Sequence, residues 1–323
     1  MTRVGGVVAI HNQIHWAEEA IRSLAAETDE LVVVDDGSSD GSGELVAALA
    51  RELGFRAIRR ARPRGVSEAY NAAVEALDAE IVLIQGGDDR TIPGRARASA
   101  ERLRDPRVTL VHSPPVVINA VGQRLPDEVA AEFQGFEGED PLRILFFDGN
   151  FICAPSAAVR RTDYLDAGGF PSNVDQLQDY ALWLELAARG QIVRLGEPVV
   201  EYRKHAGNLS REYSGYSPRV WRESFERDWI RNRFIGTADE SMLVRLGSVP
   251  SRAEGAPIAI RRLLVRLCSQ LPGLVRYGLD DLFDDLATRG DVALEELGID
   301  RASLAELIAL AGSGAAMRPR ERD

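Results

Sequence analysis

The sequence predicts an α/β protein in which a mostly parallel, Rossmann-like sheet with flanking helices is followed by a C-terminal α-helical region. Three observations predict this fold class. Short apolar runs alternate with helical periodicity through the first 113 residues, two of these runs end in paired aspartates, and the pattern beyond residue 218 is helical. Repeated βα units of this spacing are typical of a doubly wound sheet that binds ligands at the carboxyl ends of its strands.

The first half of this region contains five expected strands and four expected helices. Its apolar runs are bounded by turn residues, as in strands that are buried on both faces of a sheet. Gly54 stands where a helix C-terminal glycine belongs, Ser67 is the expected N-cap of the third helix, and Pro93 is expected in the first turn of the fourth. The strands are Val4–Ile10, Leu31–Val34, Phe55–Arg59, Ile81–Gln85 and Val108–Ser113, and the helices are Trp16–Ala26, 43–53, 67–77 and Pro93–Leu103.

The alternation breaks at Pro114. We expect a small hairpin from Val116, a mobile acidic loop over 126–140, a strand at Phe151–Cys153, a helix over 179–188, and closing strands at 192–195 and 198–202. The domains expected are 1–215, divided into halves at 113/114, and a helical region over 216–323 with a disordered tail from Met317. The helices expected in that region are 219–234, 257–267, 279–288 and 303–311.

Composition narrows the class of protein. Of 323 residues, 45% are hydrophobic and 28% charged, and 39 basic against 50 acidic residues give a net charge of −11. This balance argues against nucleic acid as a partner, because binding there needs a basic surface. Cys153 and Cys268 are too far apart in sequence to suggest a disulfide framework or a zinc site. No segment approaches the ~20 apolar residues of a membrane span or resembles a signal peptide, so we expect a cytoplasmic protein.

Two stretches carry the candidate chemistry. In IVLIQGGDDR, Asp88 and Asp89 follow a strand and offer oxygen ligands for Mn²⁺ or Mg²⁺; the structural alternative is a carboxylate that caps the next helix. In LVVVDDGSSDGS, the carboxylate of Asp36 can accept the ring N–H of uracil or thymine. Half of a calcium loop is a competing interpretation, but Ala47 stands where the bidentate glutamate belongs.

The order of these motifs resembles a family 2 glycosyltransferase. The motifs are HN after the first strand, VVVDDGSSDGS, RGVSEAYNAAV, GGDD, QDYALWLELAARG and YRKHAGNLS, and the resemblance covers Val4 to Arg211, roughly two-thirds of the chain. It implies a GT-A fold, with a nucleotide-binding half (1–113) and an acceptor-binding half (114–215). It also implies transfer of a sugar from a nucleoside diphosphate, usually with inversion at the anomeric carbon.

The resemblance also implies roles for individual residues. The nucleotide-sugar-binding residues would be Ala9, His11, Asn12, Asp36, Arg64, Gly65 and Asp88. Asp36 would hold the base, Asp88 the ribose or sugar, and Asp89 the metal that bridges the phosphates. His205 would be a second metal contact, Asp179 the catalytic base with Asp175 as competitor, and Asn150 an acceptor contact. The structural alternatives are that Asp179 only caps its helix and that His205 is only structural.

The sequence departs from the family pattern in three places. His11 replaces the aromatic residue that packs on the base, and Gly86 stands where an additional aspartate is common. RPRG replaces an NxG pattern, which puts Arg64 near the position where asparagine is common. The departures at His11 and Arg64 leave a second hypothesis open, a nucleotide-sugar-binding module that has lost catalysis. A nucleotidyltransferase is a third, although the segment after the first strand, 11–16, contains no glycine for a phosphate loop.

The leading hypothesis is therefore a metal-dependent inverting glycosyltransferase that uses a UDP- or dTDP-sugar. Its acceptor would be a hydroxyl of a polysaccharide, a glycolipid or a natural product, free or lipid-linked. The basic, apolar stretch Pro257–Tyr277 is an expected packing or homodimer helix, with peripheral contact to the inner membrane face as the alternative.

Overall fold

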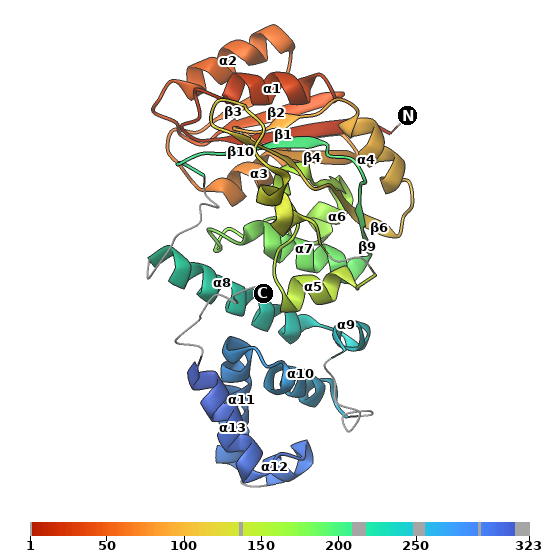
Figure 1. Cartoon of the computed structure of the whole chain (residues 1–323), viewed down its shortest axis with the longest axis vertical. Coiled ribbons are helices and arrows are strands. Elements are labelled where there is room, and N and C mark those ends of the chain that lie inside the picture. The colour runs from red at the N-terminus through yellow and green to blue at the C-terminus, as the bar shows by residue number, and fades with distance from the viewer. Residues whose placement is uncertain (1, 136–137, 209–217, 248–255, 290–291, 314–323) are drawn as a thin grey trace. The chain divides into compact units, whose positions relative to one another are not determined.

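The computed structural model describes residues 2–135, 138–208, 218–247, 256–289 and 292–313 (Figure 1). The chain divides into two compact units, Met1–Ser217 and Pro218–Asp323. The domain boundary expected at 215/216 and the tail expected from residue 317 both lie outside the described residues.

Unit 1 is built on a seven-stranded sheet with the order β3-β2-β1-β4-β8-β6-β9. All its neighbouring strands are parallel except β8, which runs antiparallel to both β4 and β6. The expected mostly parallel sheet is confirmed. The strands are β1 (Val4–Ile10), β2 (Glu30–Asp35), β3 (Arg56–Arg59), β4 (Ile81–Gly86), β6 (Val108–His112), β8 (Ala158–Arg160) and β9 (Gln191–Arg194).

Helices cover both faces of this sheet. Figure 1 shows α1 and α2 on one face, and α3, α6 and α7 on the other. The side chains of α1, α2 and α4 share a buried cluster with β1, β2 and β4, which fixes the strands against these helices. The helices of unit 1 are α1 (Ala17–Ala25), α2 (Ser42–Leu53), α3 (Val66–Glu75), α4 (Arg95–Leu103), α5 (Pro141–Phe147), α6 (Arg161–Asp166) and α7 (Gln178–Arg189), with 3₁₀ turns η1 (Asp127–Phe133) and η2 (Ala154–Ser156).

A second, three-stranded sheet joins distant parts of unit 1. It consists of β5 (Arg90–Thr91), β10 (Val200–Lys204) and β7 (Val116–Asn119) in the order β5-β10-β7. Because β10 pairs with β5, the segment that follows β10 lies beside the GGDD turn. This pairing brings the YRKH motif to the site described below.

Several local expectations were wrong, and tertiary contacts explain them. Phe151–Cys153 is buried but forms no strand, and the strand is β8 instead. The N-cap of α3 is Gly65, not Ser67, because the Asp36 carboxylate accepts from the N–H groups of Arg64 and Gly65. The helix expected from Pro93 begins only at Arg95, after Gly94 as N-cap.

The acidic segment 126–140 also differs from the expected mobile loop. It contains η1, and Asp140 caps α5 by accepting a hydrogen bond from the Leu142 N–H over 2.9 Å. Residues 136 and 137 lie outside the described part.

The described residues of unit 2 are helical. The helices are α8 (Pro218–Thr237), α9 (Glu240–Leu246), α10 (Ile258–Cys268), α11 (Pro272–Arg289), α12 (Val292–Leu297) and α13 (Arg301–Ser313). Leucines and isoleucines of α10, α11 and the segments after them form a separate apolar core. Among all the helices described, none has the length and apolarity that a membrane crossing requires.

Candidate active site

The carboxyl ends of β1, β2 and β4 form one edge of the large sheet. Ala9 of β1 pairs with Val34 of β2 and with Gly86 of β4, so the three strands end side by side. The residues that follow them are His11 and Asn12, Asp36, and Asp88. The structure therefore gathers the nucleotide-sugar-binding residues expected from the first half of the sequence at one edge, where ligands bind in open α/β sheets.

Asp36 organises the loop before α3. Its carboxylate accepts from Arg60 Nη1 at 2.9 Å, from the Gly65 N–H at 2.8 Å, and from the Arg64 N–H, which is shared between the two oxygens at 3.0 and 3.1 Å. Gly37, with φ of +70°, makes this approach possible, because a Cβ there would lie 2.5 Å from the Arg62 carbonyl carbon. Asp36, Arg64 and Gly65 are thus in direct contact.

His11 and Asn12 form a fixed pair. His11 Nδ1 lies 2.9 Å from the carbonyl oxygen of Asp36, and a carbonyl only accepts, so Nδ1 carries the proton. The other ring nitrogen, Nε2, then accepts from Asn12 Nδ2 at 3.1 Å. Asn12 has a left-handed backbone, with φ of +55°, and its Oδ1 accepts from the Ser39 N–H. The exposed His11 ring is therefore held with a defined orientation at the sheet edge.

Asp40 does not join Asp36 in a cation-binding loop. Its carboxylate accepts from the backbone N–H groups of Ile14 and Ser42, at 3.0 Å each, and from the Ser42 hydroxyl. These contacts fix the start of α2 to the segment after β1. The calcium-loop interpretation therefore has no geometric support.

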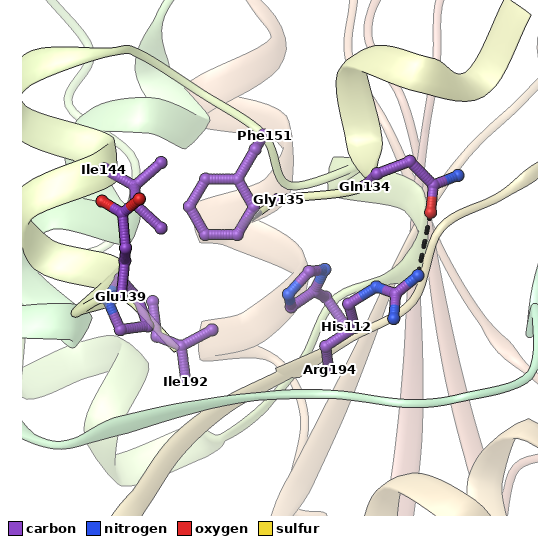
Figure 2. Close-up of a pocket in the computed structure, with 9 residues that line it drawn as sticks. His112, Gln134, Gly135, Glu139, Ile144, Phe151, Ile192 and Arg194 are labelled. Carbon is purple, nitrogen blue, oxygen red and sulfur yellow. Dashed lines mark hydrogen bonds between the residues drawn. The ribbon is translucent and has the colours of Figure 1, made fainter. Parts of the chain in front are cut away.

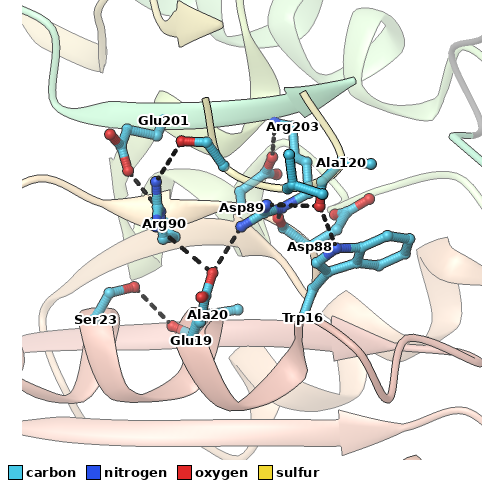
Figure 3. A network of polar contacts seen from close by, with 12 residues as sticks. Trp16, Glu19, Ala20, Ser23, Asp88, Asp89, Arg90, Ala120, Glu201 and Arg203 are labelled. Carbon is cyan, nitrogen blue, oxygen red and sulfur yellow. Dashed lines mark hydrogen bonds and ion pairs between the residues drawn. The ribbon is translucent and has the colours of Figure 1, made fainter. Parts of the chain in front are cut away.

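Asp88 and His205 lie in direct contact although 117 residues separate them in sequence. Asp88 Oδ2 is 2.8 Å from His205 Nε2, and both side chains are mostly buried. The indole of Trp16 stacks on the His205 ring with a centroid distance of 4.0 Å, and its Nε1 donates to the Ala120 carbonyl. Figure 3 shows Trp16 beside Asp88. The carboxylate and the imidazole are held on one side of the GGDD turn.

Asp89 points into the protein instead. Its side chain is 2% exposed, and Oδ1 accepts from the backbone N–H of Arg203 at 2.9 Å. Burial, and then the neighbouring Asp88 carboxylate, raise the pKa of Asp89 well above its ordinary range. Asp88, and not Asp89, therefore faces His205. The assignment of the metal to Asp89 and of the donor to Asp88 stays a prediction.

Arg203 holds the Asp88 turn in place. Its guanidinium donates to the Asp88 carbonyl at 2.7 Å and the Ala120 carbonyl at 3.1 Å, and forms an ion pair with Glu19 at 2.8 Å (Figure 3). The sequence analysis missed both Arg203 and Trp16. The signal for Arg203 was a charged residue within an apolar strand pattern, where a buried partner is required. Trp16 carries no distinctive local signal.

Close packing leaves little room for a side chain at either glycine of GGDD. A Cβ on Gly87 would lie 2.4 Å from Gln13 Oε1, and a Cβ on Gly86 would lie 2.6 and 2.8 Å from carboxylate oxygens of Asp89 and Asp88. The additional aspartate common at the position of Gly86 would therefore not fit this arrangement without moving both carboxylates.

The residues present fit a divalent metal that the substrate helps to hold. The described residues contain no cluster of three or more His, Cys, Asp or Glu that could form a complete protein site. Mg²⁺ is nevertheless commonly bound by one or two side chains together with substrate phosphates and water. In this structure Asp88 Oδ2 and His205 Nε2 share a hydrogen bond of 2.8 Å, and both are atoms of the kinds that can ligate a divalent ion.

Asn150 and Asp179, assigned to the acceptor and to catalysis, are brought together. Asn150 Nδ2 donates to Asp179 Oδ2 at 3.0 Å, and the Tyr180 N–H donates to Oδ1 at 2.7 Å. Burial raises the pKa of Asp179 to about 6, while these two hydrogen bonds act in the opposite direction. A carboxylate of this kind is suited to accept a proton near neutral pH.

The direction of β8 places this pair at the same sheet edge. β8 runs antiparallel to β4, with Leu83 opposite Ala158, and the Ile84 N–H donates to the Ala157 carbonyl. The residues before Ala158, which include Asn150, therefore continue past the carboxyl end of β4. The Asn150–Asp179 pair and the Asp88–His205 pair therefore both lie beyond the carboxyl edge of the sheet.

The mostly parallel sheet and the carboxylates at its carboxyl edge define an α/β protein of the class that binds ligands at that edge. Residues 7–168 match the sequence model of the family described as glycosyl transferase family 2. This match spans half of the chain, and the protein belongs to that family. It shares the GT-A fold, and membership of this family favours glycosyl transfer over the nucleotidyltransferase hypothesis.

One curated relative and one solved structure show the extent of the similarity. An uncharacterized protein of Mycobacterium tuberculosis (strain CDC 1551 / Oshkosh) is 29% identical over 57% of this chain and 62% of its own length. TarS 1-349 of S. aureus, solved in complex with UDP-GlcNAc, has a TM-score of 0.60 at 19% identity, over 97% of this chain and 92% of its own. The chain spans less than two thirds of the length of the curated relatives it matches.

A second solved structure is similar in fold. The mannosyltransferase PcManGT from Pyrobaculum calidifontis, in complex with GDP-Man and Mn²⁺, has a TM-score of 0.52 at 20% identity, over 97% of this chain and 87% of its own.

Proposed function

We propose that the protein is a metal-dependent inverting glycosyltransferase that moves a sugar from a UDP- or dTDP-sugar to an acceptor hydroxyl. The observation that carries this proposal is the Asp179 carboxylate. Burial raises its pKa to about 6, and a hydrogen bond from Asn150 fixes its orientation. It lies at the same sheet edge as Asp36 and Asp88. One carboxylate that takes a proton is the requirement of an inverting displacement.

The hydrogen bonds of Asp36 favour a pyrimidine base. A carboxylate offers about four lone-pair sites. Arg60, Arg64 and Gly65 supply three donors to Asp36, which leaves room for about one more. Uracil and thymine present a single ring N–H, whereas guanine presents two adjacent N–H groups. The exposed ring of His11 offers a stacking surface for the base. TarS was solved with UDP-GlcNAc and PcManGT with GDP-Man, so the fold itself accommodates both kinds of nucleotide.

Asp88 and His205 are the residues that we expect to hold Mn²⁺ or Mg²⁺. When bound, the ion would neutralise the charge that develops on the leaving diphosphate. The chain's own residues prepare this position: Trp16 stacks on His205, and Arg203 fixes the Asp88 carbonyl. PcManGT, which shares the fold, was solved with Mn²⁺.

Asp179 would act as the general base. Its carboxylate would accept the acceptor hydroxyl proton while the hydroxyl oxygen attacks the anomeric carbon opposite the diphosphate. The Asn150 amide keeps one carboxylate oxygen in a fixed direction, and partial burial limits competition by water. Such a base typically contributes about 10²–10⁴ in rate.

A donor screen tests this proposal. Nucleoside diphosphate release is measured with panels of UDP-, dTDP- and GDP-sugars and Mn²⁺, and the anomeric configuration of the product is read by NMR. We expect turnover with a UDP- or dTDP-sugar, inversion, and a loss of about 10²–10⁴ in Asp179→Asn. Asp78→Asn, an exposed carboxylate far from this edge, is the matched control. Full activity in Asp179→Asn would show that the base has been misassigned.

The same donor screen distinguishes the enzyme from the second hypothesis, a nucleotide-sugar-binding module. A nucleotide-sugar-binding module without catalysis would bind UDP in a calorimeter and release no product with any donor. The fixed Asn150–Asp179 pair favours the enzyme, because a binding module has no need of an oriented carboxylate whose pKa is raised.

The acceptor, the cytoplasmic location and the homodimer or membrane contact through 257–277 stay predictions. The arginines of α10 favour packing over a membrane contact, because they bind within unit 2. Arg261 pairs with Glu240 at 2.7 Å, Arg262 donates to the Ala238 carbonyl, and Arg266 donates to Asn232.

A further inference from the structure

A cavity of about 330 Å³ lies between the carboxyl ends of β6 and β9 and the start of α5. Figure 2 shows its walls. It is large enough for a small ligand, and its lining mixes aromatic, aliphatic and charged side chains. The residues that the argument uses are His112, Glu139, Ile144, Phe151, Ile192 and Arg194.

His112 is the feature of this cavity that points to a ligand. Its side chain is 1% exposed, and its Nδ1 has no hydrogen-bond partner in the described part of the chain. Figure 2 shows the imidazole turned toward the wall formed by Ile144, Glu139 and Ile192. Burial, and then the nearby Arg194, lower the pKa of His112 to about 3, so the ring is neutral and offers one donor and one acceptor. A buried polar group normally has a partner.

The charges in the wall balance. Arg194, whose guanidinium donates to Gln134 Oε1 at 2.9 Å, supplies N–H donors, and Glu139 supplies carboxylate acceptors. Opposite charges of equal number favour a neutral ligand over an anion. Phe151 packs edge-on against His112 with a centroid distance of 5.6 Å and adds an aromatic surface. Donors, acceptors and an apolar face together suit a neutral ring that carries several hydroxyl groups.

The cavity shares two segments with the candidate base. Phe151 directly follows Asn150, which binds Asp179. Ile144 directly precedes Leu145, whose carbonyl accepts from the hydroxyl of Tyr180, the residue after Asp179. A ligand in the cavity would therefore contact the same two segments that hold the base in position.

We propose that this cavity binds one neutral glycosyl ring of the acceptor, held by His112, Arg194 and Glu139 around the Phe151 face. The inference rests on the proposed function, since it assigns an acceptor to the transfer reaction. It adds a substrate class: the acceptor is a glycan or glycoside whose bound sugar is uncharged. Contacts remote from the attacked hydroxyl provide affinity and orientation for the acceptor.

Binding of simple glycosides to the full chain, measured without any transfer reaction, tests the proposal. Saturation-transfer NMR measures the affinity of methyl glycosides of glucose, galactose, mannose and N-acetylglucosamine at millimolar concentrations. Inorganic phosphate, followed by the broadening of its phosphorus NMR line, is the anionic comparison. His112→Phe keeps the ring volume and removes both nitrogens, and Phe151→Leu removes the aromatic face. Phe133→Leu, an aromatic residue of η1 that packs on Tyr202, is the matched control. Calorimetry with UDP is run on every variant.

We expect at least one glycoside to bind, and His112→Phe and Phe151→Leu each to weaken it by about three- to tenfold with UDP affinity unchanged. The proposal is overturned if no glycoside binds, if neither variant changes the affinity, or if phosphate alone binds. Should His112→Phe fail to unfold cooperatively, Phe151→Leu decides. Absence of both UDP and dTDP binding in the unmodified protein would refute the proposed function separately, since the glycoside measurement does not depend on it.

Discussion

The amide of Asn150 donates a hydrogen bond to the carboxylate of Asp179 over 3.0 Å, across 29 positions of sequence. Asn150 lies in the segment between α5 and β8, and Asp179 lies in the first turn of α7. The antiparallel insertion of β8 brings the two residues to one edge of the sheet. The pair provides an oriented carboxylate with a raised pKa, and we propose that it deprotonates the acceptor hydroxyl. The first two predictions below test it.

The rate of nucleoside diphosphate release should fall at acidic pH, and protonation of Asp179 should set this acidic limb of the pH profile. The base acts only when deprotonated, so the rate should rise with pH through about 6 and then level off. Asn150→Ala removes a hydrogen bond that lowers the pKa of Asp179, so its limb should move to higher pH. The measurement is the rate of UDP release against pH, with Asp78→Asn as control. A limb that stays in place in Asn150→Ala would contradict the assignment.

Stability should change with pH through the same carboxyl group. The folded protein raises the pKa of Asp179 from 3.8 to about 6, so the folded state holds this proton more tightly than the unfolded chain. The resulting stabilisation is complete below about pH 3.8 and is lost as the pH rises through about 6.

The unfolding free energy of the unmodified protein, relative to Asp179→Asn, should therefore fall by roughly 2–3 kcal/mol between these limits. Urea unfolding of both proteins across that pH range measures the difference. A difference that is independent of pH would mean that the pKa of Asp179 is not raised.

Metal binding should depend on Asp88 and His205 more than on Asp89. Asp88→Asn and His205→Gln each remove a side chain from the close pair, and each should weaken Mn²⁺ binding by about tenfold or more. Asp89→Asn retains an oxygen for the Arg203 N–H and should affect binding less. Calorimetry with Mn²⁺ in the presence of UDP measures this. The opposite order would restore the assignment made from sequence.

Arg203 should matter far more to stability than its partner Glu19. Arg203→Met leaves the part-buried Asp88 carbonyl without this donor and takes one of two donors from the Ala120 carbonyl, so it should cost about 1–3 kcal/mol. Glu19 is 53% exposed, so Glu19→Gln should cost less than about 1 kcal/mol. Urea unfolding compares the two variants. Equal losses would show that the ion pair, and not the carbonyl contacts, is the important feature.

Much of the fold could be predicted because its signals are local. Apolar runs such as Ile81–Ile84 end in glycine and aspartate, and this pattern alone indicates strands with functional residues at their carboxyl ends. The strand Val4–Ile10 and the helix over 179–188 appear where they were expected. The errors at Ser67 and Phe151 have one cause. In both places a distant group, the Asp36 carboxylate or the pairing of β8, outweighed the local preference.

The sequence by itself determined the α/β class, the family resemblance and the identity of the carboxylates at the strand ends, because periodicity and turn chemistry act over a few residues. Only the tertiary structure decided which carboxylate faces His205, that Trp16 stacks on that ring, and that Asn150 binds Asp179. These contacts depend on strand pairing across more than a hundred residues, as between β10 and β5. Such pairing is set by the free energy of the whole fold, and no local pattern encodes it.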